Sequence, residues 1–136
     1  MLSKTVVFES LGGPEVLAVL DRETSPPAPN EVQVRMRAAG LNRAEYMFMA
    51  GEYLVEPALP SRIGIEGAGH IEAVGEDVSG FKPGDEVFVV PSFSPRDYGV
   101  LSELANLPSE SLVAKPPWLA FEPAAAVLVP FLTAWY

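Results

Sequence analysis

Proline and glycine recur along the whole chain and limit how long any regular element can be. The 136 residues include 14 prolines and 11 glycines, and both residue types interrupt helices and form turns. We therefore expect a mainly β fold of short strands joined by turns. Apolar, β-branched-rich segments predict strands over residues 5–8, 16–20, 31–38, 68–74, 86–90, 98–105 and 112–115.

The clearest strand signal is followed by the clearest helix signal. In EVQVRMRA, residues 31–38, apolar and polar residues alternate with the period of two that turns one face of a strand inward. Asn42 is a residue type that caps helices, and Gly51 is the type that ends them in a left-handed conformation. This spacing predicts a short helix over residues 43–50.

A second helical segment is expected from Phe121, in FEPAAAVLVPFLTAWY. Pro123 suits the first turn of a helix and the three alanines favour its continuation, whereas Pro130 must kink or break it. Because no capping residue follows the last apolar residues, we expect this helix to continue into a longer protein.

The charge balance argues against several classes of partner. Nine Lys and Arg residues against eighteen Asp and Glu residues leave a formal net charge of −9, which would repel nucleic acids and anionic lipid headgroups. No apolar run approaches the roughly 20 residues that span a bilayer, and MLSKTVVFES lacks the apolar region of a signal peptide. We expect a cytoplasmic protein with no nucleic-acid and no membrane partner.

The glycine-rich stretch GIEGAGHIEAVG, residues 64–75, suggests a dinucleotide phosphate loop. Such a loop needs glycine at its first, third and sixth places and a helix directly after it. Counted from Gly67, the sixth place is Glu72, and HIEAVG alternates like a strand. A turn into a strand is therefore favoured over a phosphate loop.

The same stretch also suggests a metal site, because it contains Glu66 and His70. Gly67 and Gly69 favour extended backbone, in which the two side chains point in unrelated directions. The chain has no cysteine and one histidine, so it cannot assemble the usual zinc ligand sets. We interpret Glu66 as an acceptor for backbone amides in a glycine-rich turn and His70 as a partly exposed strand residue.

Three longer segments are informative when taken together. They are PAPNEVQVRMRAAGLNRAEYMFMAGEY, LPSRIGIEGAGHIEAVGEDVSGFKPGDEVFV and AAAVLVPFLTAWY. With these segments the chain resembles the medium-chain dehydrogenase/reductase superfamily. The resemblance implies that residues 1–120 form a GroES-like, partly open β-barrel that carries the substrate cleft. Residues 121–136 would then begin the helix that leads to a Rossmann cofactor domain outside this sequence.

The family's zinc-binding pattern is altered in this sequence. Asn42, Ile65 and an apolar residue near Val129 stand where zinc alcohol dehydrogenases carry Cys, His and Cys, and Glu66 alone remains. The resemblance therefore implies the branch without zinc, the quinone oxidoreductases and related enoyl reductases.

A second pattern of that branch is also recognisable. Asn42, Gly51 and Tyr53 match Asn-x-x-Asp-x-x-x-Arg-x-Gly-x-Tyr, but Glu45 stands in place of Asp and Met49 in place of Arg. The substitution by methionine weakens any inference about a charged contact to substrate or cofactor phosphate at that position.

The resemblance implies hydride transfer from NADPH to a quinone or an enone. Asn42 would lie near the nicotinamide or the substrate carbonyl and Thr133 near the nicotinamide ring, while Tyr46, Tyr53 and Ile65 would contact substrate. From the residues alone, Asn42 serves equally well as a helix cap, and packing is the favoured role for the two tyrosines.

Two alternatives to this function remain open. The chain could be a relative of the zinc alcohol dehydrogenases, or a GroES-like binding or assembly module without catalysis. If the enzyme hypothesis holds, we expect a homodimer at full length and no turnover by residues 1–136 alone.

Overall fold

The computed structural model describes residues 1–136 and contains eight strands with short helices between and after them. The strands are β1 (Leu2–Phe8), β2 (Leu17–Glu23), β3 (Glu31–Ala39), β4 (Ser61–Arg62), β5 (Gly67–Val74), β6 (Glu86–Val89), β7 (Leu104–Pro108) and β8 (Leu112–Ala114). The helices are α1 (Arg43–Ala50), α2 (Phe121–Ala124) and α3 (Leu128–Trp135), with 3₁₀ turns η1 (Pro14–Val16) and η2 (Ser109–Ser111).

The strands form two antiparallel sheets. One has the order β2-β1-β4 and the other the order β7-β3-β5-β6-β8. The sheets meet where the Val6 N–H donates to the Leu101 carbonyl and the Glu103 N–H donates to the Lys4 carbonyl. The expected mainly β fold is confirmed, and the two sheets remain separate ladders that do not close into a barrel.

The main core lies against the five-stranded sheet, and β3 contributes to it as the alternating pattern predicts. Val32 and Val34 of β3 are fully buried in this core. Gln33, on the other face, is also buried, because its side-chain amide donates to the Ser25 carbonyl and to Asn106 Oδ1. The proline-rich connector between β2 and β3 thus covers the face that the pattern assigned to water.

A smaller core fixes α1 against the three-stranded sheet. The rings of Phe8 in β1 and Phe48 in α1 meet edge to face, with centroids 5.8 Å apart. Met49 and Ile63 complete this buried cluster. Edge-to-face aromatic pairs add to the free energy gained by burying their area, so α1 is held firmly at the end of β3.

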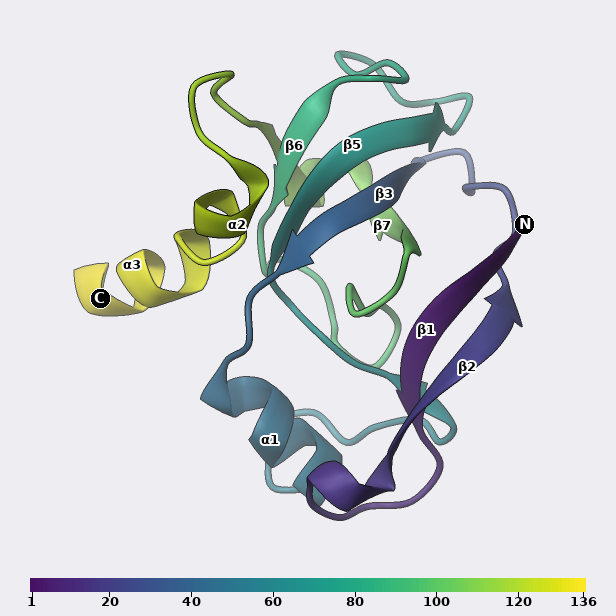
Figure 1. The fold of residues 1–136 in the computed structure, drawn as a ribbon, viewed down its shortest axis with the longest axis vertical. Coiled ribbons are helices and arrows are strands. Elements are labelled where there is room, and N and C mark those ends of the chain that lie inside the picture. Colours follow the sequence, from purple (N-terminus) through teal and green to yellow (C-terminus); the bar gives the residue numbers. More distant parts are fainter.

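The last two helices lie beside the five-stranded sheet (Figure 1), with α2 in contact with β3 and β5. Ala124 and Ala125 are buried there against Ala68 and Phe88. The other helix, α3, contains no buried residue. Figure 1 shows α1 and the α2–α3 pair on the same side of the molecule, around the end of β3.

Two local predictions were wrong. Residues 98–103 form no strand apart from an isolated bridge between Ser102 and Thr5, because the N–H groups of Val100 and Leu101 donate to the loop carbonyls of Gly64 and Ile63. The C-terminal helix breaks before Pro130. This proline lies in the first turn of α3, where the N–H that it lacks would have no intrahelical partner.

Six of the seven predicted strands are present, with ends displaced by at most three residues. The helix predicted over residues 43–50 is confirmed with the same bounds. None of the helices has the length and apolar character needed to cross a membrane.

Candidate functional site

Asn42 lies at the junction between β3 and α1, and it is the N-cap of the helix. Its backbone is extended, with φ −129° and ψ 158°, and its N–H donates to Glu45 Oε2 at 2.8 Å. At the other end of α1, Gly51 adopts the left-handed conformation with φ 75°. The predicted capping role of Asn42 and the predicted helix end are both confirmed.

The Asn42 side chain is bound to a buried carboxylate. Its Nδ2 donates to Glu66 Oε2 at 3.1 Å, and Glu66 is only 1% exposed. The other oxygen, Glu66 Oε1, accepts the Val129 N–H at 2.8 Å. Glu66 therefore does accept a backbone amide, but the donor lies in α3 and not in the glycine-rich turn that the sequence suggested.

Gly40 makes room for this carboxylate. A Cβ at Gly40 would overlap both Glu66 Oε2 and the Ala125 carbonyl oxygen. The Gly40 N–H also donates to the Glu66 backbone carbonyl at 3.0 Å. The backbone at Gly40 thus lies closer to the Glu66 carboxylate and to the segment after α2 than a side chain at this position would permit.

A second buried carboxylate, Glu45, holds Asn42 from the other side. Glu45 Oε1 accepts the Ile65 N–H at 3.3 Å, while Oε2 accepts the Asn42 N–H. Burial raises the pKa of the Glu45 carboxyl, and these backbone hydrogen bonds offset that effect only in part. The family pattern alone gives Glu45 no such role, but the Asn-x-x-Glu spacing is a helix-start signal that points to it.

Thr133 lies one turn after Val129 on α3, and it is exposed. Its Oγ1 donates to the Val129 carbonyl at 2.7 Å. The hydroxyl hydrogen is therefore used within the helix, and the oxygen keeps lone pairs with which to accept a hydrogen bond. Through Val129 and Glu66, the structure joins the segment that carries Thr133 to Asn42.

The other three predicted site residues have different surroundings. Tyr46 is 52% exposed on α1. Tyr53 is partly buried and packs against the cluster that contains Phe8 and Phe48, as the packing interpretation predicts. Ile65 is partly buried, and its N–H binds Glu45.

The glycine-rich stretch forms a strand and neither a phosphate loop nor a metal site. Residues 67–74 form β5 and lead into no helix, so the strand interpretation is confirmed. His70 is a partly exposed residue of β5, as predicted, and lies opposite Arg35 of β3. No three or more His, Cys, Asp or Glu side chains gather in a way that could hold a metal ion.

Comparison with known proteins gives a consistent result. Residues 28–117 match the family model of the alcohol dehydrogenase GroES-like domain. The quinone oxidoreductase of Pseudomonas aeruginosa is 44% identical over 135 residues, which make up 99% of this chain and 40% of that protein.

Two solved structures have the same fold. The quinone oxidoreductase of Pseudomonas syringae pv. tomato DC3000 has a TM-score of 0.85 at 41% identity, over 98% of this chain and 40% of that one. The Escherichia coli quinone oxidoreductase complexed with NADPH has a TM-score of 0.86 at 33% identity, over 98% of this chain and 39% of that one.

This chain spans about 40% of the length of these relatives. The similarity runs through both sheets and on into the C-terminal helices, and the fold expected from the sequence resemblance is confirmed. On the family model and the shared fold together, the chain belongs to the alcohol dehydrogenase GroES-like domain family, within the medium-chain dehydrogenase/reductase superfamily.

Proposed function

We propose that residues 1–120 are the substrate domain of an NADPH-dependent oxidoreductase that reduces quinones or enones by hydride transfer without zinc. Residues 121–136 would begin the helix that leads to a cofactor domain in a protein of the relatives' length. The similarity to quinone oxidoreductases, one of them complexed with NADPH, supports this class of reaction. The observation that carries the proposal is the hydrogen-bonded link between Asn42 and the helix of Thr133.

Asn42 can polarise a substrate carbonyl. One Nδ2 hydrogen is used by Glu66, and the amide nitrogen carries a second hydrogen. This hydrogen can donate to an oxygen on which negative charge develops when hydride reaches a quinone or enone. A donor held in place before the reaction stabilises such charge without reorganisation during the step.

The residues of α3 fit the nicotinamide end of the cofactor, which supplies the hydride when bound. Because the Thr133 hydroxyl hydrogen is used by Val129, Thr133 would accept a hydrogen bond from the nicotinamide carboxamide. Residues 67–74 are a strand and offer no phosphate loop. We therefore assign the nucleotide and phosphate contacts to the cofactor domain.

The exposed aromatic residues of α3 support this arrangement. Phe131 is 71% exposed and Trp135 is 87% exposed. Large apolar side chains that gather at a surface commonly mark a contact with another domain or partner. A cofactor domain that packs against α3 would cover them and would bring its nicotinamide site next to Thr133.

The test uses the full-length protein and follows NADPH oxidation with a small quinone or enone. We expect turnover in the wild type, and a loss of about 10²-fold in kcat for Asn42→Ala because one charge-stabilising donor is removed. Loss of the Asn42 side chain removes the helix cap and leaves the buried Glu66 Oε2 without its donor, so about 1–3 kcal/mol of stability should be lost as well. Asn42→Ser, which keeps a capping oxygen, should recover the part of that stability that comes from the cap, and should not recover the rate.

Three outcomes would contradict the proposal. Equal turnover in Asn42→Ala would remove Asn42 from the reaction. Stoichiometric zinc in the purified protein would favour the alcohol dehydrogenase alternative. Failure of the full-length protein to bind NADPH would favour a non-catalytic GroES-like module. Residues 1–136 alone should show no turnover in the same assay.

The assembly and location of the protein are part of this proposal. We infer a cytoplasmic homodimer at full length, without nucleic-acid or membrane partners. The net charge of −9 supports the exclusion of polyanionic partners. Light scattering of the full-length protein and cell fractionation are the corresponding measurements.

A further inference from the structure

We propose that Glu66 is a positioning residue that selects the orientation of the Asn42 amide and couples it to the docking of α3. The effect of this orientation on catalysis rests on the proposed function. Its structural part, the orientation of one amide by one carboxylate, is independent of that function and has a test of its own.

The two oxygens of Glu66 bind different parts of the chain. Oε2 accepts from Asn42 Nδ2 at 3.1 Å, and Oε1 accepts from the Val129 N–H at 2.8 Å. The two donors come from positions 24 and 63 residues away in the sequence. A single buried side chain therefore joins the end of β3 to the beginning of α3.

This arrangement decides the direction of the Asn42 amide. Oε2 accepts from Asn42 Nδ2 and Oε1 accepts from the Val129 N–H, so both oxygens of Glu66 act as acceptors in the structure. A carboxylate only accepts hydrogen bonds, whereas an amide can turn over and present either its nitrogen or its oxygen. Asn42 must therefore present Nδ2 to Glu66, and this choice decides where its second N–H points.

The carboxylate of Glu66 also has little room to move. Glu66 is almost fully buried, and a Cβ at Gly40 would overlap Oε2. The backbone of Asn42 is fixed as well, because its N–H donates to Glu45. With the backbone held by one carboxylate and the side chain by another, the remaining Nδ2 hydrogen has one direction in space.

The coupling to α3 follows from the same contacts. If the start of α3 moves, Glu66 Oε1 loses the Val129 N–H, which is one of the two side-chain hydrogen bonds that orient the carboxylate toward Asn42. Because Thr133 binds the Val129 carbonyl, the proposed nicotinamide contact and the proposed polarising group depend on one carboxylate. The docking of α3 and the orientation of the Asn42 amide toward the substrate are thus linked.

The decisive variant is Glu66→Gln. Glutamine has one acceptor oxygen and one donor NH₂ in nearly the same volume, so it can satisfy the Val129 N–H only by turning its NH₂ toward Asn42. Asn42 then has to turn over and present Oδ1. We expect the fold to persist while the donor that faces the substrate is replaced by an acceptor.

Hydrogen exchange in residues 1–136 tests the orientation without any catalysis. In the wild type, we expect the Asn42 side-chain amide and the Val129 backbone amide to be protected from exchange. Glu66→Gln should keep protection at Val129 and lose it at the Asn42 amide, and Glu66→Ala should lose both. Unchanged protection of the Asn42 amide in both variants would overturn the proposal.

Turnover of the full-length protein tests the catalytic part. Glu66→Gln should lower kcat by about 10-fold or more, with the KM for NADPH within about 3-fold of the wild type, since a transition-state contact is lost and a binding contact is not. Glu72→Gln, on the surface of β5, is the matched control for loss of one carboxylate. Equal loss of kcat in both variants, or none in Glu66→Gln, would overturn the catalytic role.

A double variant separates positioning from folding. Asn42→Asp with Glu66→Gln exchanges donor and acceptor, so the introduced glutamine amide can donate to the introduced carboxylate and the net charge is unchanged. We expect this protein to regain the wild-type melting temperature and to remain slow. Recovery of kcat together with stability would show that turnover needs neither the Asn42 donor nor its orientation by Glu66, and would overturn the proposal.

The proposed function can fail separately. If the wild-type full-length protein reduces no quinone or enone, while exchange in residues 1–136 follows the expected pattern, the function is wrong and the orientation of Asn42 by Glu66 stands. If turnover is present and the exchange pattern is absent, the positioning role is wrong.

Discussion

Lys115 Nζ lies 2.8 Å from Glu86 Oε2, and the lysine side chain is 2% exposed whereas the glutamate side chain is 43% exposed. The same ammonium group donates to the carbonyls of Pro116 and Leu119. It also lies 4.9 Å from the centroid of the Phe121 ring. A single buried cation therefore fastens the segment between β8 and α2 to the edge of the five-stranded sheet.

The first prediction is that Lys115→Met lowers the free energy of unfolding by about 1–3 kcal/mol, because two backbone carbonyls lose their donor. Glu86→Gln should cost less than about 1 kcal/mol, since its carboxylate is largely in water and the ion pair is screened. Urea denaturation of the two variants measures both values. A larger loss for Glu86→Gln than for Lys115→Met would mean that the ion pair matters more than the carbonyl contacts.

The second prediction concerns Gly69 in β5. A Cβ there would overlap the carbonyl oxygen of Arg35 in the neighbouring strand, and backbone atoms of a paired strand cannot move aside as a side chain can. We expect Gly69→Ala to cost about 1–3 kcal/mol of stability, as overpacking does elsewhere. Equilibrium denaturation measures the effect.

Gly13→Ala is the control for that variant. A Cβ at Gly13 would meet only the carboxylate end of the exposed Glu15 side chain, which can move aside at the cost of its solvent-exposed hydrogen bond with the Gly13 N–H. The cost should stay below about 0.5 kcal/mol. Equal losses of stability in Gly13→Ala and Gly69→Ala would contradict the explanation that Gly69 is required by the close approach of the Arg35 carbonyl.

The helix over residues 43–50 was predictable because its signals are local. Asn42 and Gly51 fix its two ends through hydrogen bonds with residues three or four positions away. The strand predicted over residues 98–105 was wrong for the opposite reason. Its apolar residues have strand propensity, but Val100 and Leu101 bind backbone groups of the loop at residues 63–64, and no local pattern encodes that choice.

The candidate site, like the fold, was predictable only in part from the sequence. The family pattern identifies Asn42 and marks Glu66 as the remaining member of a lost metal set. Neither periodicity nor spacing could show that Glu66 binds the N–H of Val129, 63 residues further on. This contact depends on the break between α2 and α3, which exposes the first N–H groups of α3, and on the space left by Gly40.

The third prediction concerns acid and Glu45. Because burial raises the pKa of the Glu45 carboxyl above its ordinary value of 4.5, the folded protein binds this proton more tightly than the unfolded chain does. The stability that this group contributes is therefore fully present when the pH is below the ordinary pKa of a glutamate. It is lost as the pH rises through the raised pKa of Glu45 in the folded protein. Relative to Glu45→Gln, the wild type should lose stability as the pH rises through that window. An opposite slope in pH-dependent denaturation would show that the hydrogen bonds of Asn42 and Ile65 outweigh burial.

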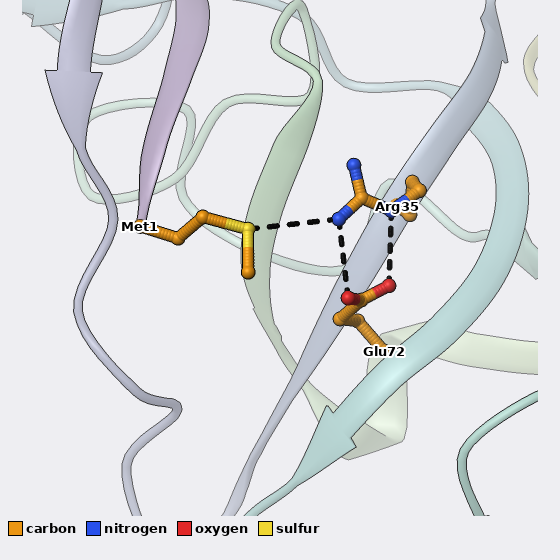
Figure 2. A network of polar contacts seen from close by, with 3 residues as sticks. All are labelled: Met1, Arg35 and Glu72. Carbon is orange, nitrogen blue, oxygen red and sulfur yellow. Dashed lines mark hydrogen bonds and ion pairs between the residues drawn. The ribbon is translucent and has the colours of Figure 1, made fainter.

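The fourth prediction concerns the ion pair across β3 and β5, shown in Figure 2. Arg35 Nε and the Nη2 group lie 2.9 and 3.1 Å from the two oxygens of Glu72, and the Met1 sulfur lies 3.7 Å from Nη2. The hydrogen bond from Arg35 lowers the pKa of the Glu72 carboxyl. The pair therefore stabilises the fold when the pH is above the ordinary pKa of a glutamate. This contribution is lost as the pH falls through the lowered pKa of Glu72.

Glu72→Gln should cost at most about 1 kcal/mol, because both side chains are about one-third exposed and solvent screens the pair. The difference from the wild type should shrink at high salt and vanish in acid, the reverse of the trend expected for Glu45. Arg35→Lys should lose most of the same free energy, since an ammonium group cannot make the two parallel hydrogen bonds of the guanidinium. Denaturation of the three proteins at several pH and salt values provides the measurement. A Glu72→Gln effect that persists unchanged in acid would assign the stabilisation to packing of the glutamate stem and not to its charge.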